Sequence, residues 1–214
     1  MRTAFGILFA ATLLTVAPVS IGYPTPAVVQ KINEWTLKTV YSQPEQIMLK
    51  MPGEPTPQRF WYIILSVTNE SSQEALEFYP VCQLITDTFQ VIPADKKVPP
   101  GVFELIKQKH HGSYPFLESL DFKDHRVFRG EDNTRDFAII WPDFDLKAKQ
   151  IDLFVGGLSN EIAVIEHPVL KDENGNPKKI FLQKTLDLKY AVAGDEKLRS
   201  NIKIKEIKKT WVMR

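Results

Sequence analysis

Cysteine is almost absent from this chain of 214 residues, because Cys82 is the only one. A single cysteine cannot form an internal disulfide, which excludes the disulfide-stapled class of secreted domains. The fold must therefore be held together by its core. Residues 78–85 around Cys82 are mostly apolar, so we expect this thiol to be a small buried group and not a nucleophile.

An excess of one charge is also lacking. The 27 lysines and arginines nearly balance the 26 aspartates and glutamates, which leaves a formal net charge of +1. Such a balance provides no overall field for nucleic acid, so we expect no nucleic-acid partner. Hydrophobic residues make up 43% of the chain, which is typical of a globular protein large enough to bury a core.

Long apolar runs are lacking after the N-terminus, so we expect no transmembrane segment there. At the N-terminus, Arg2 precedes an uncharged, mainly apolar run over residues 4–16, with small residues at positions 20 and 22. An uncleaved anchor is the alternative, but a bilayer takes roughly 20 apolar residues to span. We interpret residues 1–22 as a signal peptide, 23–30 as an extended tether and 31–214 as one domain.

No cysteine follows the apolar run of residues 4–16, which argues against a lipoprotein. A bacterial host is expected, with the protein in the periplasm, on the cell surface or in the medium.

Short strand-like stretches separated by turn residues dominate the rest of the chain. Residues 59–69 are apolar on nearly both faces and predict a central strand. One amphipathic stretch that begins with two prolines predicts a single short helix near residues 100–111. Further patterns predict strands over residues 34–41, 46–51, 75–88, 136–141, 151–155, 162–165, 179–192 and 202–212, and a hairpin turn over residues 172–177. This series indicates a mainly β fold, an antiparallel sandwich with one helix.

Residues 136–161 hold the clearest strand pattern of the chain. Two apolar strands, residues 136–141 and 151–155, flank a polar turn that is rich in aspartate. Each strand alternates apolar and other side chains, which places one apolar face of each toward a core. We interpret the two as partner strands of one hairpin.

Two stretches resemble immunoglobulin-like β-sandwich domains of bacterial extracellular proteins. One is Trp-Tyr-Ile-Ile-Leu-Ser-Val-Thr-Asn at residues 61–69, and the other is the strand, turn and strand of residues 134–155. The antibody pattern of two cysteines around a tryptophan is absent, since only Cys82 exists. The resemblance implies an immunoglobulin-like sandwich with an adhesion, binding or envelope role, and it transfers no active site.

The turn regions contain two patterns that could carry chemistry. Residues 157–161 approach the nucleophile elbow G-x-S-x-G, but Glu161 stands in place of the last glycine and a strand follows in place of a helix. We therefore expect a turn in which Ser159 makes local backbone hydrogen bonds. Asp143, Asp145 and Asp152 are candidate ligands of a hard cation such as calcium, although solvated turn carboxylates are the simpler interpretation. We predict no catalytic residue and no cofactor.

The four histidines do not form a recognisable zinc motif. His110 and His111 are adjacent, so they point about 100° apart on a helix and cannot chelate one ion together. We expect them to lie at the helix C-terminus, where positive charge is favourable. His125 and His167 are isolated in the sequence.

The C-terminal residues 197–214 carry seven basic residues and one acid, Glu206. Four of them, Lys203, Lys205, Lys208 and Lys209, form a possible anion-binding edge. The alternative is that lysines on an edge strand prevent edge-to-edge aggregation, which we favour. The sequence as a whole predicts an exported, non-catalytic protein that binds a protein or envelope component. The alternative is a secreted hydrolase or metal-binding protein whose site forms only in space.

Overall fold

The computed structural model describes residues 27–28, 34–194 and 202–214. The predicted signal peptide, most of the predicted tether and residues 195–201 lie outside the described residues. Ala27–Val28 of the tether form the short strand β1. Helix α1 spans Pro100–His110, which confirms the predicted helix, and a short 3-10 helix η1 spans Glu131–Asn133. In the described part of the chain, no helix is long and apolar enough to cross a membrane.

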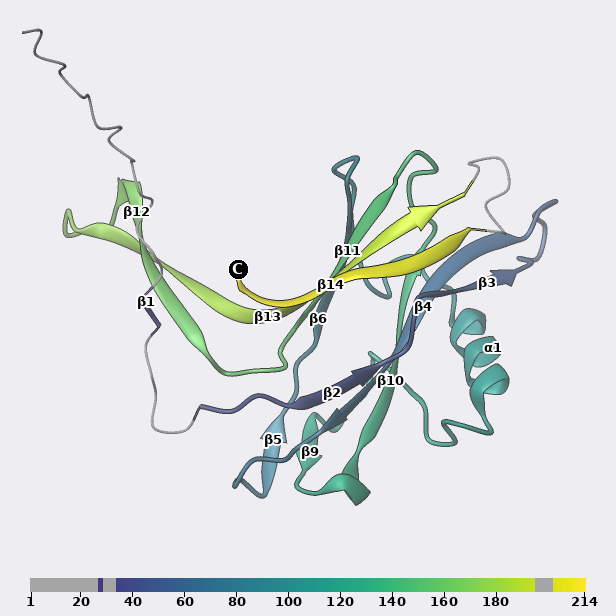
Figure 1. The fold of residues 1–214 in the computed structure, drawn as a ribbon, viewed down its shortest axis with the longest axis horizontal. Coiled ribbons are helices and arrows are strands. Elements are labelled where there is room, and N and C mark those ends of the chain that lie inside the picture. Colours follow the sequence, from purple (N-terminus) through teal and green to yellow (C-terminus); the bar gives the residue numbers. More distant parts are fainter. Residues whose placement is uncertain (1–26, 29–33, 195–201) are drawn as a thin grey trace, which may run out of the picture.

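The strands form two main sheets that face each other (Figure 1). The larger sheet runs in the order β1, β12 (Ile162–Lys171), β13 (Pro177–Ala193), β11 (Gln150–Gly156), β6 (Val81–Thr86) and β7 (Val91–Pro93), and β14 (Lys203–Met213) also pairs with β13. The smaller sheet runs in the order β2 (Lys38–Tyr41), β4 (Gln58–Thr68), β10 (Arg135–Pro142) and β8 (Glu118–Ser119), and β3 (Glu45–Leu49) also pairs with β4. Strands β5 (Ala75–Glu77) and β9 (Arg126–Phe128) form a separate pair. The fold is mainly β, as predicted, and all pairs are antiparallel except that of β8 with β10.

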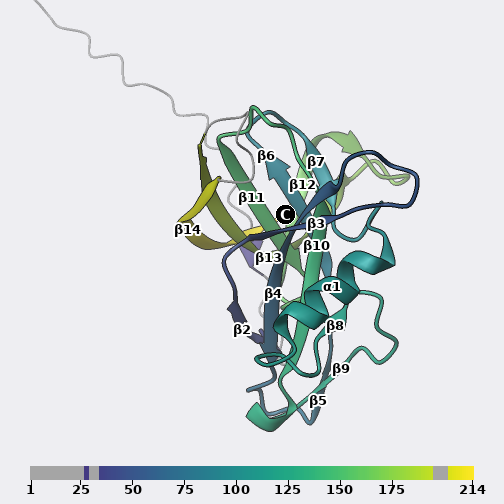
Figure 2. The same cartoon turned by 90° about the vertical axis from the view of Figure 1, so that its right-hand side faces the viewer.

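Strand β4 is buried on both faces, which confirms the prediction of a central strand. Trp61 and Ile63 point into the core between the two sheets. Phe60 and Tyr62 point the other way and pack under α1, together with Ile106 of the helix. The helix therefore forms a third layer over the outer face of the smaller sheet (Figure 2).

The predicted hairpin of residues 136–155 is wrong. Strand β10 pairs with β4 and β8, whereas β11 pairs with β13 and β6, so the two strands lie in different sheets. The connection between them carries the chain from one sheet to the other. Alternation in a sequence identifies the face of a strand that is buried, but it does not identify the neighbouring strand. Phe137 and Leu153 nevertheless belong to the same core, between the two sheets.

The strand boundaries elsewhere follow the predicted pattern with some divisions. The predicted strand of residues 75–88 divides into β5 and β6, with Pro80 between them. The turn of residues 172–177 joins β12 to β13, and Gly175 has the positive φ of 81° that this turn requires. Cys82 is buried, as expected. The described residues form 14 strands, which is more than predicted, because several are only two or three residues long.

Candidate binding site on a projecting hairpin

The most distinctive feature of the molecule is a two-stranded hairpin that extends beyond the sandwich. Strands β11 and β12 pair one after the other with the same side of β13, β11 along residues 186–191 and β12 along residues 177–183. Strand β14 pairs with the opposite side of β13, but only along residues 184–193. Residues 162–183 therefore form a ribbon that leaves the body of the protein, which we call the arm (Figure 1).

A bulge between β11 and β12 fixes the position where the arm leaves the body. Gly157 has a φ of +86°, and a Cβ at this position would lie 2.2 Å from the carbonyl oxygen of Tyr79. Ser159 is buried, and its hydroxyl donates to the carbonyl oxygen of Trp35 at 2.9 Å. The Trp35 N–H donates to Oδ1 of Asn160 at 2.8 Å. The nucleophile-like pattern is thus a structural bulge, and its hydrogen bonds are not only local, because two of them reach a residue far away in the sequence.

Polar side chains next to this bulge hold the root of the arm together. Glu161 forms an ion pair with Lys184 of β13, and the hydroxyl of Thr36 donates to Glu161 at 3.2 Å. The hydrogen bond from Lys184 and its charge lower the pKa of Glu161. The ammonium group of Lys184 also lies 5.2 Å from the ring centre of Trp211, on β14. Four segments of the chain are therefore joined where the arm begins.

Apolar side chains lie on both faces of the arm. Phe181 is 68% exposed, Val169 is 78% exposed and Leu170 is 51% exposed. Ile165 and Ile180 lie opposite each other on the face of the ribbon that points away from Phe181, and both are half-buried. Beyond the short β1, which pairs with Ala163 and Val164, the described arm has only two strands, and a two-stranded ribbon is at best marginally stable on its own in water. Exposed apolar groups on such an element indicate a surface that is covered by something else.

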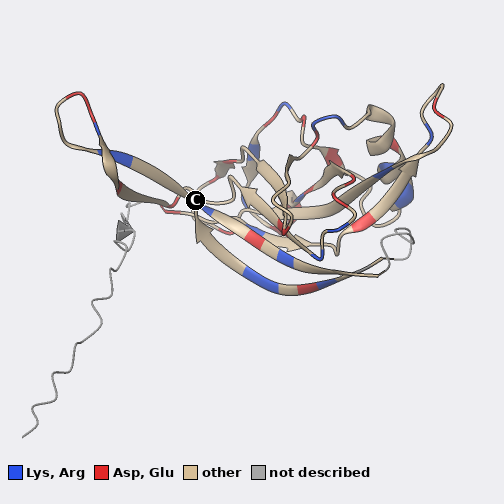
Figure 3. Ribbon diagram, turned by 90° about the horizontal axis from the view of Figure 1, so that it is seen from above, with Lys and Arg blue, Asp and Glu red and all other residues tan. Residues whose placement is uncertain are grey.

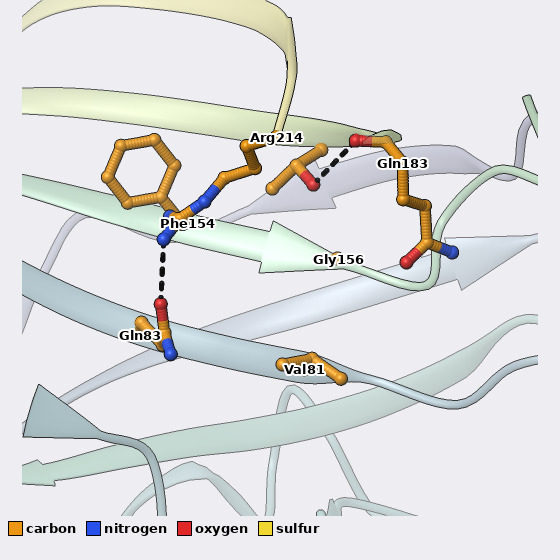
Figure 4. Close-up of a pocket in the computed structure, with 7 residues that line it drawn as sticks. Val81, Gln83, Phe154, Gly156, Gln183 and Arg214 are labelled. Carbon is orange, nitrogen blue, oxygen red and sulfur yellow. Dashed lines mark hydrogen bonds between the residues drawn. The ribbon is translucent and has the colours of Figure 1, made fainter. Parts of the chain in front are cut away.

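A pocket of about 250 Å³ lies at the base of the arm (Figure 4). The guanidinium of Arg214 stacks on the ring of Phe154 at 4.0 Å and donates to Oε1 of Gln83 at 2.9 Å. Gly156 lines the pocket with backbone alone. A Cβ at this position would lie only 3.3 Å from the carbonyl oxygen of Val81 on the neighbouring strand. Gln183 and Thr185 complete the lining, so Arg214 supplies the only charged side chain among the lining residues. A pocket of this composition favours an anionic group.

The predicted lysine edge lies on β14, which pairs only with β13 among the described residues and is therefore an edge strand. Lys205, Lys208 and Lys209 are exposed, and the side chain of Lys203 lies outside the described part (Figure 3). Lys208 and Lys209 are neighbours in a strand and point to opposite faces. The ammonium group of Lys209 lies 4.9 Å from the ring centre of Tyr41, on the edge of the other sheet. These lysines thus do not form one continuous surface.

Two of the three candidate metal ligands, Asp143 and Asp145, lie in the connection between β10 and β11, and each has a structural hydrogen bond. Asp143 accepts a hydrogen bond from the indole N–H of Trp61 at 2.8 Å. Asp145 accepts one from the backbone N–H of Lys147 at 3.0 Å, within its own turn. Asp152 lies on β11. Within residues 34–194 and 202–214, no three His, Cys, Asp or Glu side chains come together in a way that could hold a metal ion.

The histidines have separate surroundings. His110 lies in the last turn of α1, as expected, and its Nε2 is 2.8 Å from the hydroxyl of Tyr62, on the sheet below. His111 follows as the C-terminal cap residue. The ring centre of His125 lies 4.4 Å from that of Tyr79 and the two rings are tilted by 31°, and His167 belongs to the arm.

One perturbed residue had no signal in the sequence. Asp95 lies in the connection after β7 with a φ of 57°, a conformation that is uncommon for residues other than glycine. Burial and the nearby charge of Asp121 raise the pKa of Asp95 to about 6. Both aspartates line two hollows of about 440 Å³ and 270 Å³. The sequence around Asp95 is typical of an ordinary polar turn. Only the packing of α1 and β10 around this aspartate shows that its pKa is raised.

No family model, curated protein or solved structure matches this chain. The function proposed below therefore rests on the residues and contacts described above.

Proposed function

We propose that this protein is an exported, non-catalytic β-sandwich protein that binds a protein or a component of the cell envelope, with the arm as its binding element. The observation that carries this proposal is the set of exposed apolar side chains on the arm, where the larger sheet extends beyond the sandwich. Phe181, Val169 and Leu170 are all more than half exposed. The sandwich core is complete without them, so folding alone does not account for their presence.

The arm offers enough apolar surface to contribute substantially to a complex. Fully burying one large aliphatic or aromatic side chain stabilises by about 1.5–3 kcal/mol. Three such side chains would contribute on the order of 5 kcal/mol, against the roughly 8 kcal/mol of a micromolar complex. Hydrogen bonds and the remaining arm residues must supply the rest and offset the entropy lost on association.

Export is supported by the N-terminal pattern of a basic residue, a short apolar run and small residues near position 22. An immunoglobulin-like character of the sandwich belongs to the same proposal. Its support is the two-sheet core and the strand of residues 61–69 that suggested the resemblance. Domains of that kind serve widely as rigid carriers of binding surfaces.

A secreted hydrolase is the second candidate, and Asp95 and Asp121 are the residues that favour it. A carboxyl group with a pKa of about 6 beside a second carboxyl group could exchange protons near neutral pH. The Ile140 N–H, however, already donates to Oδ1 of Asp95 at 3.3 Å, which gives that side chain a structural use. We therefore place the arm first.

The proposal can be tested with a photo-crosslinking amino acid in the full-length protein, expressed in the organism that encodes it. Position 181 on the arm is compared with position 89, where Phe89 is 92% exposed on a turn of the sandwich. We expect a discrete crosslinked product from position 181 and none from position 89. Fractionation of the same cells should place the protein outside the cytoplasm. Equal crosslinking at both positions, or a cytoplasmic protein, would contradict the proposal.

A further inference from the structure

We propose that the smaller of the two hollows beside Asp95, of about 270 Å³, binds a primary ammonium group on a short apolar stem. Two kinds of molecule carry that chemistry, a free alkylamine and the lysine side chain of a peptide, and the experiment below distinguishes them. The N-terminal part of α1 forms one wall, so we call this site the helix hollow. The inference goes beyond the proposed function and does not depend on the arm.

The walls of the helix hollow are mainly apolar. They consist of Val98, Pro99, Pro100, Phe103 and Ile140, to which Ser119 of β8 adds a hydroxyl group. The two prolines have no N–H group, so this part of the wall offers no backbone donor to an anion. Apolar walls of this kind suit the hydrocarbon stem of a ligand, because its surface is removed from water there.

Every charged side chain that lines the helix hollow is acidic. Asp95 comes from the connection after β7, Glu104 from α1 and Asp121 from the connection after β8. In the described part of the chain, none of these three carboxylates forms an ion pair with a lysine or arginine. A cation is therefore the ligand that complements the hollow.

Two lysines lie near the hollow without lining it. The ammonium group of Lys107 lies 5.8 Å from the ring centre of Phe103, on the same helix. Lys96 lines the larger hollow, on the other side of Asp95. These side chains reduce the local negative charge, but they leave the helix hollow itself with carboxylates alone.

A bare metal ion is not the expected cation. Within residues 34–194 and 202–214, no three His, Cys, Asp or Glu side chains come together in a way that could hold one. The three carboxylates of the hollow come from three separate segments and stand among apolar side chains. An organic cation can fill the apolar space and still reach a carboxylate, which a bare ion cannot do.

Asp95 adds a second reason to expect a cation. Burial, and then the like charge of Asp121, raise the pKa of Asp95 to about 6, so this buried group is ionised at neutral pH. Its Oδ1 accepts a hydrogen bond from the Ile140 N–H at 3.3 Å, which an asparagine could accept equally well without the charge. The hydrogen bond therefore does not explain why a carboxylate stands here, whereas a bound ammonium group does.

The backbone holds Asp95 at the hollow in an uncommon conformation. Asp95 has a φ of 57°, and Lys97 in the same connection has a φ of 61°. The Asp95 N–H also donates to the Ile140 carbonyl oxygen at 2.8 Å, which ties this connection to β10. Strained residues that the surrounding structure holds in place are concentrated at binding sites and active sites.

The direct test is an NMR titration of the full chain at pH 7 with n-butylamine, and with n-butanol as the uncharged control. We expect the amide signals of Val98, Ser119 and Ile140 to shift and to saturate at millimolar butylamine, which is an ordinary affinity for so small a ligand. Butanol should not saturate these shifts. Saturation by both compounds alike, or by neither, would overturn the proposal.

A capped tripeptide with a central lysine is the second probe. Tighter binding of this peptide than of butylamine would support the hollow as a site for the lysine side chain of a partner protein. Tighter binding of butylamine would support it as a site for a free amine.

The variant D95N should weaken butylamine binding at least tenfold at pH 7, whereas the control D132N, at an exposed position, should bind like the native protein. The affinity of the native protein should fall about tenfold at pH 5, because only about a tenth of Asp95 is ionised one unit below its pKa. Asp121, Glu104 and Lys96 are the other charged groups that line the two hollows beside Asp95. They are retained in D95N, so the affinity of this variant should depend less on pH. Unchanged binding by D95N would overturn the role of Asp95 and leave the proposed function of the arm untouched.

Discussion

Asp95 should make the protein less stable as the pH rises from about 4 to about 6. Its side chain is largely buried against strand β10, where the Ile140 N–H donates to its Oδ1 at 3.3 Å. The Asp95 N–H in turn donates to the Ile140 carbonyl oxygen at 2.8 Å. Burial is the largest influence on the pKa of Asp95, and Asp121 adds like charge. Together they outweigh the backbone hydrogen bonds of Ile140 and Leu120 to the carboxylate, which lower the pKa.

The direction and size of the effect follow from linkage. The pKa of Asp95 is about 6 in the folded protein, against an ordinary value of 3.8 in the unfolded chain. Between these values the folded protein retains a proton that the unfolded chain has released, so stability falls as the pH rises. A difference of about 2 units corresponds to about 3 kcal/mol, all of it lost once the pH exceeds 6.

The substitution D95N should remove this loss. Asparagine keeps an oxygen for the Ile140 N–H, cannot ionise and tolerates the positive φ of 57° at this position. We expect the variant and the native protein to be equally stable near pH 4. Above pH 7 the variant should be more stable by about 3 kcal/mol, which is about 6–12 °C in melting temperature for a chain of this size.

The measurement is urea unfolding followed by tryptophan fluorescence and circular dichroism at steps of half a pH unit. The exposed Asp132 provides a matched control, and D132N should run parallel to the native protein over the whole range. The difference between D95N and the native protein isolates Asp95 from all other titrating groups. A difference that stays constant with pH, or one that grows toward acid, would refute the reasoning.

Three further predictions concern the root of the arm and the core. Replacing Gly157 by alanine should lower the free energy of unfolding by about 2–4 kcal/mol, because its positive φ and the Tyr79 carbonyl leave no room for a Cβ. An unchanged midpoint of urea unfolding would contradict this. A double-mutant cycle of E161Q and K184M should give a coupling of about 1–2 kcal/mol, since both groups are mostly buried; additive effects would show that the pair does not stabilise the root. Burial raises the pKa of Cys82, so a thiol reagent should modify it only after unfolding, and rapid labelling of the native protein would disprove that.

Patterns within single segments predicted most of the secondary structure. The helix near residues 100–111, the central strand of residues 59–69 and the turn around Gly175 all correspond to described elements. Each depends on local chemistry, such as prolines at a helix start or a glycine with a positive φ, or on burial of both faces of one strand. Such features are encoded in neighbouring residues and need no knowledge of the rest of the fold.

The candidate site was predicted only in part. Glycines and polar residues at 156–161 suggested a turn, yet nothing indicated that Ser159 and Asn160 bond to Trp35. The exposed face of Phe181 could not be anticipated, because an alternating apolar strand normally implies a covered face. Asp95 had no sequence signal at all, since its perturbation arises from groups that are distant in the chain.

The sequence by itself determined that this chain is rich in β-strands, has one α-helix and has no second cysteine for an internal disulfide. It also located the hydrophobic faces of most strands. Only the tertiary structure decided that residues 136–141 and 151–155 lie in different sheets, and that β13 continues beyond its neighbour β14 as an arm. Strand pairing is a contact between distant segments, and many registers can satisfy the same alternation of residues. The choice among them is made by the packing of the whole core.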